Sequence, residues 1–359
     1  MTRDPPARPA ARRLRAQPEA RSPQARPEAR SPRALPKANL HVHLMTGAMR
    51  PATLAELAAR AGLALPPPFA RGTVHGWAAF QQRYDAARAA IRTPSDIARV
   101  VIEAATDDAA CGAGWLEIQV DPTSYAALAG GLDGALAAVL AGAARAPIPV
   151  GVVVAASWAA PPGHALALAR LAAAYANRGV VGFGLSNDER LGTVAAMAPA
   201  CAEAAAAGLR IVPHAGFYTP AGHVADCVRL LGASRIGHGL SAAGSPATVA
   251  LLAARGVALE VCPTSYPPLG VAEIAALPVR ALLAAGVPVA LATDDPLLFG
   301  ADLATQYALV RDVLGGTDQE LAALARHSIE ASAAPPAVRQ PLLDGVARWL
   351  GSCATETGR

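Results

Sequence analysis

Short apolar runs alternate with longer segments of helical spacing through most of this chain. The runs are rich in Val, Ile, Leu and Ala and are bounded by Gly and Pro, which is typical of parallel strands covered on both faces. Eight such runs, each followed by a helical segment, predict a (β/α)8 TIM barrel. The predicted strands span residues 39–44, 115–120, 148–156, 180–186, 209–215, 235–239, 257–262 and 287–293.

The segments between the strands repeat apolar residues at the spacing of helices that pack on one face. Residues 301–350 carry the same periodicity after the last strand, so they predict extra helices packed outside the barrel. The barrel domain is therefore predicted over residues 36–350. The predicted connecting helices are 52–62, 75–91, 95–112, 129–145, 163–177, 192–207, 221–231, 245–255 and 277–285.

Both ends of the chain differ from the predicted barrel in composition. Residues 1–35 are rich in Arg, Pro and Ala, and the sequence EARSP at 19–23 recurs at 28–32. Without apolar periodicity this tail cannot offset its ordering entropy, so it is predicted to be disordered. A transit peptide or an over-extended translation start are the alternative interpretations. Residues 351–359 are predicted to be a flexible C-terminus.

The charge of the chain is unevenly distributed. The whole chain carries a formal charge of +4, but residues 1–35 contain nine arginines against three acidic residues, which leaves −2 for the rest. The predicted barrel therefore lacks the basic surface that nucleic-acid binding requires. Five cysteines without a C-x-x-C spacing indicate neither a disulfide framework nor a cysteine zinc site, and a reducing cytoplasm fits them. The sequence contains no uninterrupted run of about 18 apolar residues, so no membrane span is predicted.

Polar residues interrupt the apolar runs mainly where strands end. His41 and His43 stand one residue apart on the first predicted strand, where side chains two positions apart share a face. His214 ends the fifth strand, His238 the sixth, and Asp294 follows the eighth. In a closed barrel the C-terminal strand ends meet at one mouth, and the eighth strand is a neighbour of the first.

Three imidazoles and one carboxylate are a ligand set suited to one Zn2+ ion, with an open position for water. We assign His41, His43, His214 and Asp294 to this set. His238 is then free to orient or deprotonate the water. Asp295, beside Asp294, is free to bind a substrate nitrogen.

The motifs HVH at 41–43, HAG at 214–216, RIGHG at 235–239 and TDDP at 293–296 follow one another in a specific order. In this order and spacing they resemble the adenosine deaminase family of metal-dependent hydrolases, and the likeness extends from about Pro36 to Pro335. The segments 114–125, 180–192 and 293–300 resemble the actinobacterial branch, some of whose members act on aminodeoxyfutalosine.

The resemblance implies a TIM barrel that binds one zinc ion through His41, His43, His214 and Asp294. It also implies hydrolytic removal of the 6-amino group of a purine nucleoside, the small-molecule substrate. His238 would assist the water, Asp295 would contact the purine, and the backbone near Asn187 would bind the purine's other edge.

The chain departs from the family pattern at the same mouth. The family has HAGE after the fifth strand, where the glutamate donates a proton to the ring nitrogen beside the attacked carbon, and this chain has Phe217 there. Met45 and Thr46 stand where the family usually has one residue, often acidic. Tyr266 replaces a usual asparagine, and Asn187 replaces a usual glycine. Glu189 is predicted to organise its own loop rather than replace the missing acid.

Three hypotheses follow from these residues. The first is a zinc hydrolase acting on a 6-aminopurine nucleoside or a modified relative of one. The second is a protein that keeps the metal and binds a purine-like ligand without turnover, because Phe217 replaces the general acid. The third is a metal hydrolase with a different substrate whose ring needs no protonation.

Overall fold

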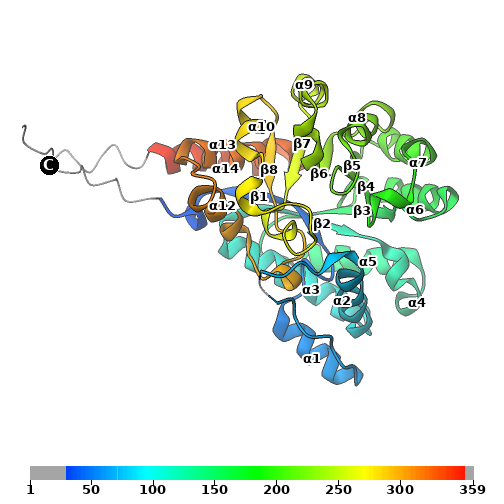
Figure 1. Cartoon of the computed structure of the whole chain (residues 1–359). Helices are drawn as coiled ribbons and strands as arrows, with labels where there is room; N and C mark the ends of the chain where they lie inside the picture. Colours follow the sequence, from blue (N-terminus) through cyan, green and yellow to red (C-terminus); the bar gives the residue numbers. More distant parts are fainter. Residues whose placement is uncertain (1–29, 71, 352–359) are drawn as a thin grey trace, which may run out of the picture.

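Eight parallel strands form the centre of the computed structural model, which describes residues 30–70 and 72–351 (Figure 1). They pair in chain order, so each strand lies between its neighbours in sequence. All eight predicted strands are confirmed. They are β1 (Lys37–His43), β2 (Ala113–Val120), β3 (Val150–Ser157), β4 (Val180–Ser186), β5 (Arg210–Ala215), β6 (Arg235–His238), β7 (Ala258–Val261) and β8 (Val289–Leu291).

The barrel closes where β1 meets the segment that follows β8. A parallel bridge pairs Val42 with Asp294. The Asp294 N–H donates to the carbonyl of His41 at 2.9 Å, and the His43 N–H donates to the carbonyl of Asp294 at 3.2 Å. The predicted TIM barrel is therefore confirmed.

Helices surround the strands, as predicted (Figure 1). The helix predicted at 129–145 begins only at residue 132, because Gly130 and Gly131 adopt φ values of 76° and 119° and separate it from a short helix that ends at residue 129. Within the described residues the helices of eight or more residues are α1 (Pro51–Ala61), α2 (Gly76–Ala90), α3 (Pro94–Ala110), α5 (Leu132–Ala143), α6 (Pro162–Ala174), α7 (Val194–Ala206), α8 (Ala221–Leu230), α9 (Pro246–Arg255), α12 (Leu303–Asp312), α13 (Asp318–Ala331) and α14 (Pro336–Gly351). The shorter helices are α4 (Ala126–Ala129), α10 (Val279–Ala284) and α11 (Pro296–Phe299).

None of the helices in the described part of the chain is by itself long and apolar enough to cross a membrane. The bent pair formed by Pro122–Ala129 and Leu132–Ala143 passes by length and composition alone.

The packed region begins before the predicted boundary at residue 36. Arg30 forms an ion pair with Asp318 at 3.0 Å, and the side chain of Leu35 is fully buried. Lys37 is also buried, and its ammonium donates to the carbonyls of Leu35 and Cys111. Most of the predicted tail, residues 1–29, and the C-terminal residues 352–359 lie outside the described residues.

A buried carboxyl group lies between α3 and β1. Asp108 is 8% exposed, and the side-chain amide of Asn39 donates to it at 3.0 Å. Burial raises the pKa of Asp108 to about 7. The folded state therefore binds a proton that the unfolded chain releases near pH 4, so Asp108 reduces stability as the pH rises from about 4 to about 7.

We expect Asp108→Asn to stabilise the fold in a pH-dependent way. At pH 8 the free energy of unfolding should rise by about 1–3 kcal/mol, because the amide removes the cost of ionising a buried carboxyl group. At pH 4 the gain should be close to zero. Urea unfolding at both pH values measures this, with Asp226→Asn, at an exposed position on α8, as the control. Equal gains at both pH values would contradict the interpretation.

Candidate metal centre and active site

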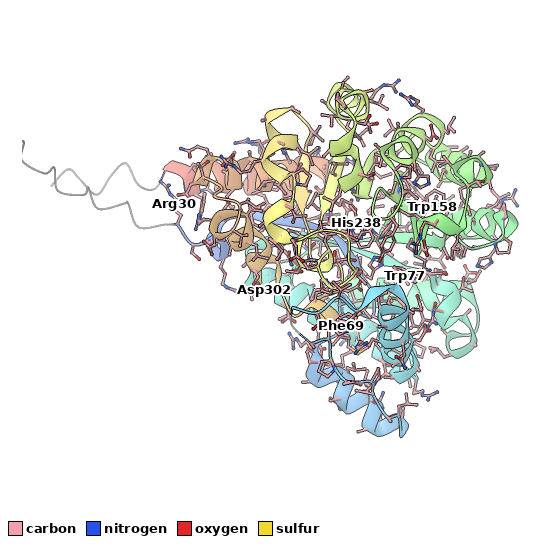
Figure 2. The ribbon with its side chains drawn as sticks, in the orientation of Figure 1. Arg30, Phe69, Trp77, Trp158, His238 and Asp302 are labelled. Atoms are coloured by element: carbon pink, nitrogen blue, oxygen red, sulfur yellow. The ribbon has the colours of Figure 1, made fainter. Side chains whose placement is uncertain are left out.

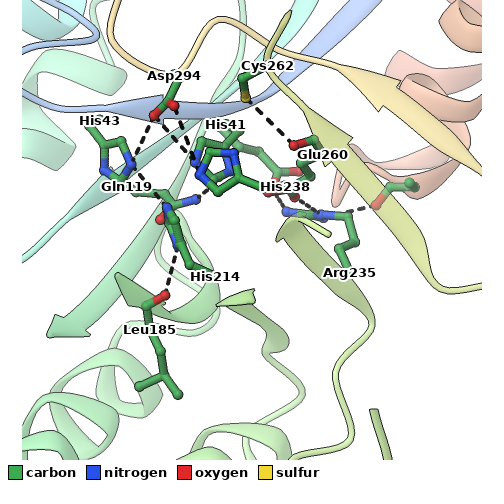
Figure 3. Close-up of polar contacts among 12 residues, drawn as sticks. His41, His43, Gln119, Leu185, His214, Arg235, His238, Glu260, Cys262 and Asp294 are labelled. Carbon is green, nitrogen blue, oxygen red and sulfur yellow. Dashed lines mark hydrogen bonds and ion pairs between the residues drawn. The ribbon is translucent and has the colours of Figure 1, made fainter. Parts of the chain in front are cut away.

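Four side chains predicted to bind metal converge at the C-terminal mouth of the barrel (Figure 3). His41 and His43 come from β1, His214 from β5, and Asp294 from the segment after β8. The Nε2 atoms of His43 and His214 lie 3.2 Å apart. Oδ1 of Asp294 lies 3.4 Å from Nε2 of His43 and 3.7 Å from Nε2 of His41.

The imidazoles of His41 and His214 are each oriented by a contact that their other ring nitrogen, Nδ1, makes away from the mouth. Nδ1 of His41 lies 2.7 Å from Oε2 of Glu260, and Nδ1 of His214 lies 2.8 Å from the carbonyl oxygen of Leu185. Both partners are acceptors, so each ring carries its hydrogen on Nδ1 and presents the lone pair of Nε2 to the mouth. Nε2 of His41 is buried and has no hydrogen-bond partner among the described residues.

The spacing of these atoms matches a tetrahedral metal site. Zinc binds imidazole nitrogen at about 2.0–2.1 Å, so two ligand atoms at a tetrahedral angle lie roughly 3.3 Å apart. The distances of 3.2 Å and 3.4 Å agree with this value, and 3.7 Å is slightly longer. An orphaned buried nitrogen at the same point also requires a partner. The donor set therefore fits a divalent cation with nitrogen and oxygen ligands.

The pKa shifts of His43, His214 and Asp294 favour metal ligation, whereas that of His41 favours the protonated ring. Burial lowers the pKa of His43 to about 4 and that of His214 well below its usual value, so both rings are neutral near pH 7. Burial alone would lower the pKa of His41 too, but the hydrogen bond and charge of Glu260 raise it. Burial would raise the pKa of Asp294, but the imidazoles around it hold it below its usual value.

His238 lies at the edge of the cluster, at the end of β6. Its Nε2 is 4.0 Å from Oδ2 of Asp294, a longer separation than those between the other imidazoles and this carboxylate. Burial lowers the pKa of His238 to about 3, so the ring is neutral near pH 7. Nitrogens of His41, His214 and His238 still lie within 4.8 Å of one another, so geometry alone also permits His238 as a ligand.

Asp295 points to a different partner from that of Asp294. The hydroxyl of Thr46 forms a short hydrogen bond with Oδ1 of Asp295, and both side chains are buried. Burial and the adjacent charge of Asp294 raise the pKa of Asp295 well above its usual value. Asp295 is thus the neutral member of the pair, and a neutral carboxyl group has a proton to donate in a hydrogen bond.

A chain of buried charges inside the barrel supports His41 and was not predicted from the sequence (Figure 3). Arg235 donates from Nε to Glu260 at 2.5 Å and from its guanidinium to Glu117. All three side chains are fully buried. The only signal in the sequence was a charged residue within each of three apolar strands.

Three predicted site residues share an unusual backbone conformation. Asn187, His238 and Asp294 have φ values of 65°, 66° and 59°, and they are the only non-glycine residues with positive φ in the described part of the chain. Such positions cost about 1–2 kcal/mol per residue and concentrate at functional sites. Beside them, Gly237 leaves room for a ring, because a Cβ there would lie 2.8 Å from Cε1 of His41.

A cavity opens beside the cluster, and the space free of atoms there is about 880 Å³, which includes open solvent at its mouth. Asn187 and Asp295, both predicted to bind substrate, line it together with His43, His214, His238 and Asp294. Trp77 of α2 and Phe217 also line it, and Figure 2 shows Trp77 on the same side of the barrel centre as His238.

Glu189 was predicted to organise its own loop, but its carboxylate instead binds the loop after β5. Its Oε1 accepts hydrogen bonds from the N–H groups of Phe217, Tyr218 and Thr219 at 2.7–2.8 Å.

The aromatic side chain of Tyr266 is fully buried, and its hydroxyl accepts a hydrogen bond from the N–H of Cys262. Tyr266 is therefore not among the residues that line the cavity.

A closed (β/α)8 barrel whose mouth gathers imidazoles and a carboxylate has the architecture of a metal-dependent hydrolase. The sequence model of the adenosine deaminase family matches residues 36–349. The chain belongs to the adenosine deaminase family.

Relatives with substantial identity span nearly the whole barrel. A Streptomyces virginiae protein named "Putative adenosine/adenine deaminase" is 49% identical over 326 residues, which are 87% of this chain and 96% of the relative. The aminodeoxyfutalosine deaminase of Acidothermus cellulolyticus is 35% identical over 287 residues, 75% of this chain and 80% of the relative.

A solved structure, the adenine deaminase of Arthrobacter aurescens, superposes with a TM-score of 0.78 at 27% identity and covers 88% of this chain and 99% of that one. An amidohydrolase from Burkholderia ambifaria with bound Zn gives a TM-score of 0.79 at 26% identity, covering 89% of this chain and 93% of that one.

We expect Glu260→Gln to weaken zinc binding by about 10–100-fold, because His41 loses the charged acceptor that orients it. Competition with a chromophoric chelator measures the affinity. The exposed Glu273→Gln provides the matched control, and thermal unfolding followed by circular dichroism checks that the barrel is intact. Unchanged zinc affinity in a folded Glu260→Gln protein would show that the charge of Glu260 does not support metal binding by His41.

Proposed function

We propose that this protein is a zinc-dependent hydrolase that removes the 6-amino group of a purine nucleoside or a modified relative of one. The observation that carries the proposal is the convergence of three imidazoles and a carboxylate at tetrahedral spacing, with a buried, unpartnered Nε2 on His41. In this proposal His41, His43, His214 and Asp294 hold one zinc ion. Membership of the adenosine deaminase family supports it.

A zinc ion bound at this point would supply a hydroxide nucleophile near neutral pH by lowering the pKa of a water molecule. The residues around it complete the chemistry. The gap of 4.0 Å between His238 and Asp294 is wide enough for both groups to contact one water. Since His238 is neutral, it takes the proton of this water and returns it to the departing ammonia.

Two residues on the barrel mouth are proposed to position the purine. Asp295, protonated and held by Thr46, donates a hydrogen bond to a nitrogen of the five-membered ring. Asn187, exposed in the cavity with a left-handed backbone, contacts the other edge. In this pose the ring nitrogen beside the attacked carbon faces Phe217, on the loop after β5.

The proposal is tested by measuring ammonia release from a panel of 6-aminopurines with zinc-loaded protein. We expect turnover of at least one nucleoside, and we expect Asp294→Ala to abolish it and to lose the zinc. Asp312→Ala, at an exposed position on α12, is the matched control and should retain both. Protein with stoichiometric zinc that releases no ammonia from any 6-aminopurine would end the proposal.

His238 is expected to affect the reaction and not the metal. His238→Gln should lower kcat by about 10²–10⁴-fold, the contribution of a positioned acid–base group, while zinc content stays at one ion per chain. Metal analysis and steady-state kinetics on the same preparation test both parts, with His164→Gln as the control. Loss of zinc in His238→Gln would instead make His238 a ligand.

A further inference from the structure

The corner of the cavity beside His238 is aromatic. The ring of Phe217 lies 4.6 Å from the ring of His238, centroid to centroid, and Tyr218 meets Phe217 edge to face at 4.7 Å. The ring centroids of Trp77 and Tyr218 lie 6.3 Å apart. Substrate placed over the metal cluster and His238 therefore meets the Phe217 side chain on this side.

None of the three described aromatic side chains that form this corner, those of Phe217, Tyr218 and Trp77, carries a carboxylic acid that could protonate a substrate ring. Glu189 is the carboxylate nearest the backbone of Phe217, and its Oε1 accepts from three backbone N–H groups and the hydroxyl of Thr219. A backbone N–H can only donate, so the carboxyl group is arranged here as an acceptor. Asp295 is engaged with Thr46, on the segment between β1 and α1.

The same carboxylate leaves one oxygen without a partner. Glu189 is 2% exposed and lines the cavity, and its Oε2 is buried with no hydrogen-bond donor among the described residues. A buried, incompletely paired anion beside aromatic rings attracts a positive charge.

Neither guanidinium group beside the cavity forms a hydrogen bond with Oε2 of Glu189; the charge of Arg190 acts on Glu189 only through space. Arg190 lies over the outer ring face of Tyr218 and is paired twice with Asp188, at 2.7 and 2.8 Å. Arg88 is paired with Asp85 at 2.6 Å and with the hydroxyl of Ser124 at 3.0 Å.

Addition of hydroxide to the 6-carbon of a neutral aminopurine drives negative charge onto the adjacent ring nitrogen, which then needs a proton. A ring that already carries a positive charge at that nitrogen needs none. We propose that the preferred substrates are 6-aminopurine nucleosides made cationic by alkylation of the ring nitrogen next to the attacked carbon, with Phe217 and Glu189 recognising the alkylated, charged edge. This inference rests on the function proposed above.

The reaction balances without an external acid. The water gives one proton to His238 as its oxygen bonds to the 6-carbon of the cation, which leaves a neutral adduct. His238 passes this proton to the amino nitrogen, the bond from the 6-carbon to that nitrogen breaks, and the remaining hydroxyl proton of the added oxygen is transferred to the released ammonia. One alkylated cation and one water thus yield a neutral 1-alkylinosine and one ammonium ion.

The test compares 1-methyladenosine with adenosine on zinc-loaded protein at pH 7, by ammonia release and mass spectrometry of the product. We expect kcat/KM to be at least about tenfold higher for 1-methyladenosine, with 1-methylinosine as product. Equal or faster turnover of adenosine would overturn the inference and leave the proposed function standing. Turnover of neither compound, nor of any other 6-aminopurine, would remove the proposed function itself.

Two variants separate recognition from loss of structure. Phe217→Glu should reverse the preference in favour of adenosine, since it supplies an acid and removes the aromatic face, whereas Phe217→Leu should keep a reduced preference for 1-methyladenosine. Glu189→Gln retains an oxygen for the three N–H groups and removes only the charge, so it should lower the preference about tenfold. An unchanged ratio of kcat/KM values in both Phe217→Glu and Glu189→Gln would contradict the assignment.

Discussion

The closing seam between β1 and the segment after β8 is the constraint on which the site depends. The N–H and carbonyl of Asp294 bond to the backbone of His41 and His43, so the residues that close the barrel also carry proposed metal ligands. In an open sheet the first and last strands would lie at opposite edges, and these side chains could not meet. The backbone hydrogen bonds that close the barrel therefore also bring these side chains together.

The interior of the barrel adds a second constraint, which is electrostatic. Glu117, Arg235 and Glu260 are fully buried. Arg235 pairs with both carboxylates, and Glu260 also contacts Nδ1 of His41, so the ion-pair network ends at this ring. Removing one partner from such a network typically costs about 3–5 kcal/mol, because it leaves an unpaired buried charge. A network of this kind specifies the rotamer of His41 more strictly than apolar packing would.

The strands and the convergence of the proposed metal ligands were predictable because both follow from local patterns. Apolar runs of fixed length define strands, and His-x-His on a strand places two imidazoles on one face without knowledge of the fold. The support of His41 was not predictable in this way, since a lone glutamate or arginine in a strand does not identify its partner. The pair Gly130 and Gly131 indicates a helix boundary, but the predicted helix was extended across it because apolar residues at helical spacing occur before and after the two glycines.

In the loop after β5, the residue that holds the backbone differs from the residue whose side chain lines the cavity. Glu189 binds the backbone N–H groups of residues 217–219, so it fixes the path of the loop whatever side chain stands at 217. Phe217 is half-buried against His238 and Tyr218, and its replacement by another side chain leaves those backbone bonds intact. These backbone hydrogen bonds do not involve the side chain at position 217, so a substitution there changes the wall of the cavity without removing the contacts that hold the loop.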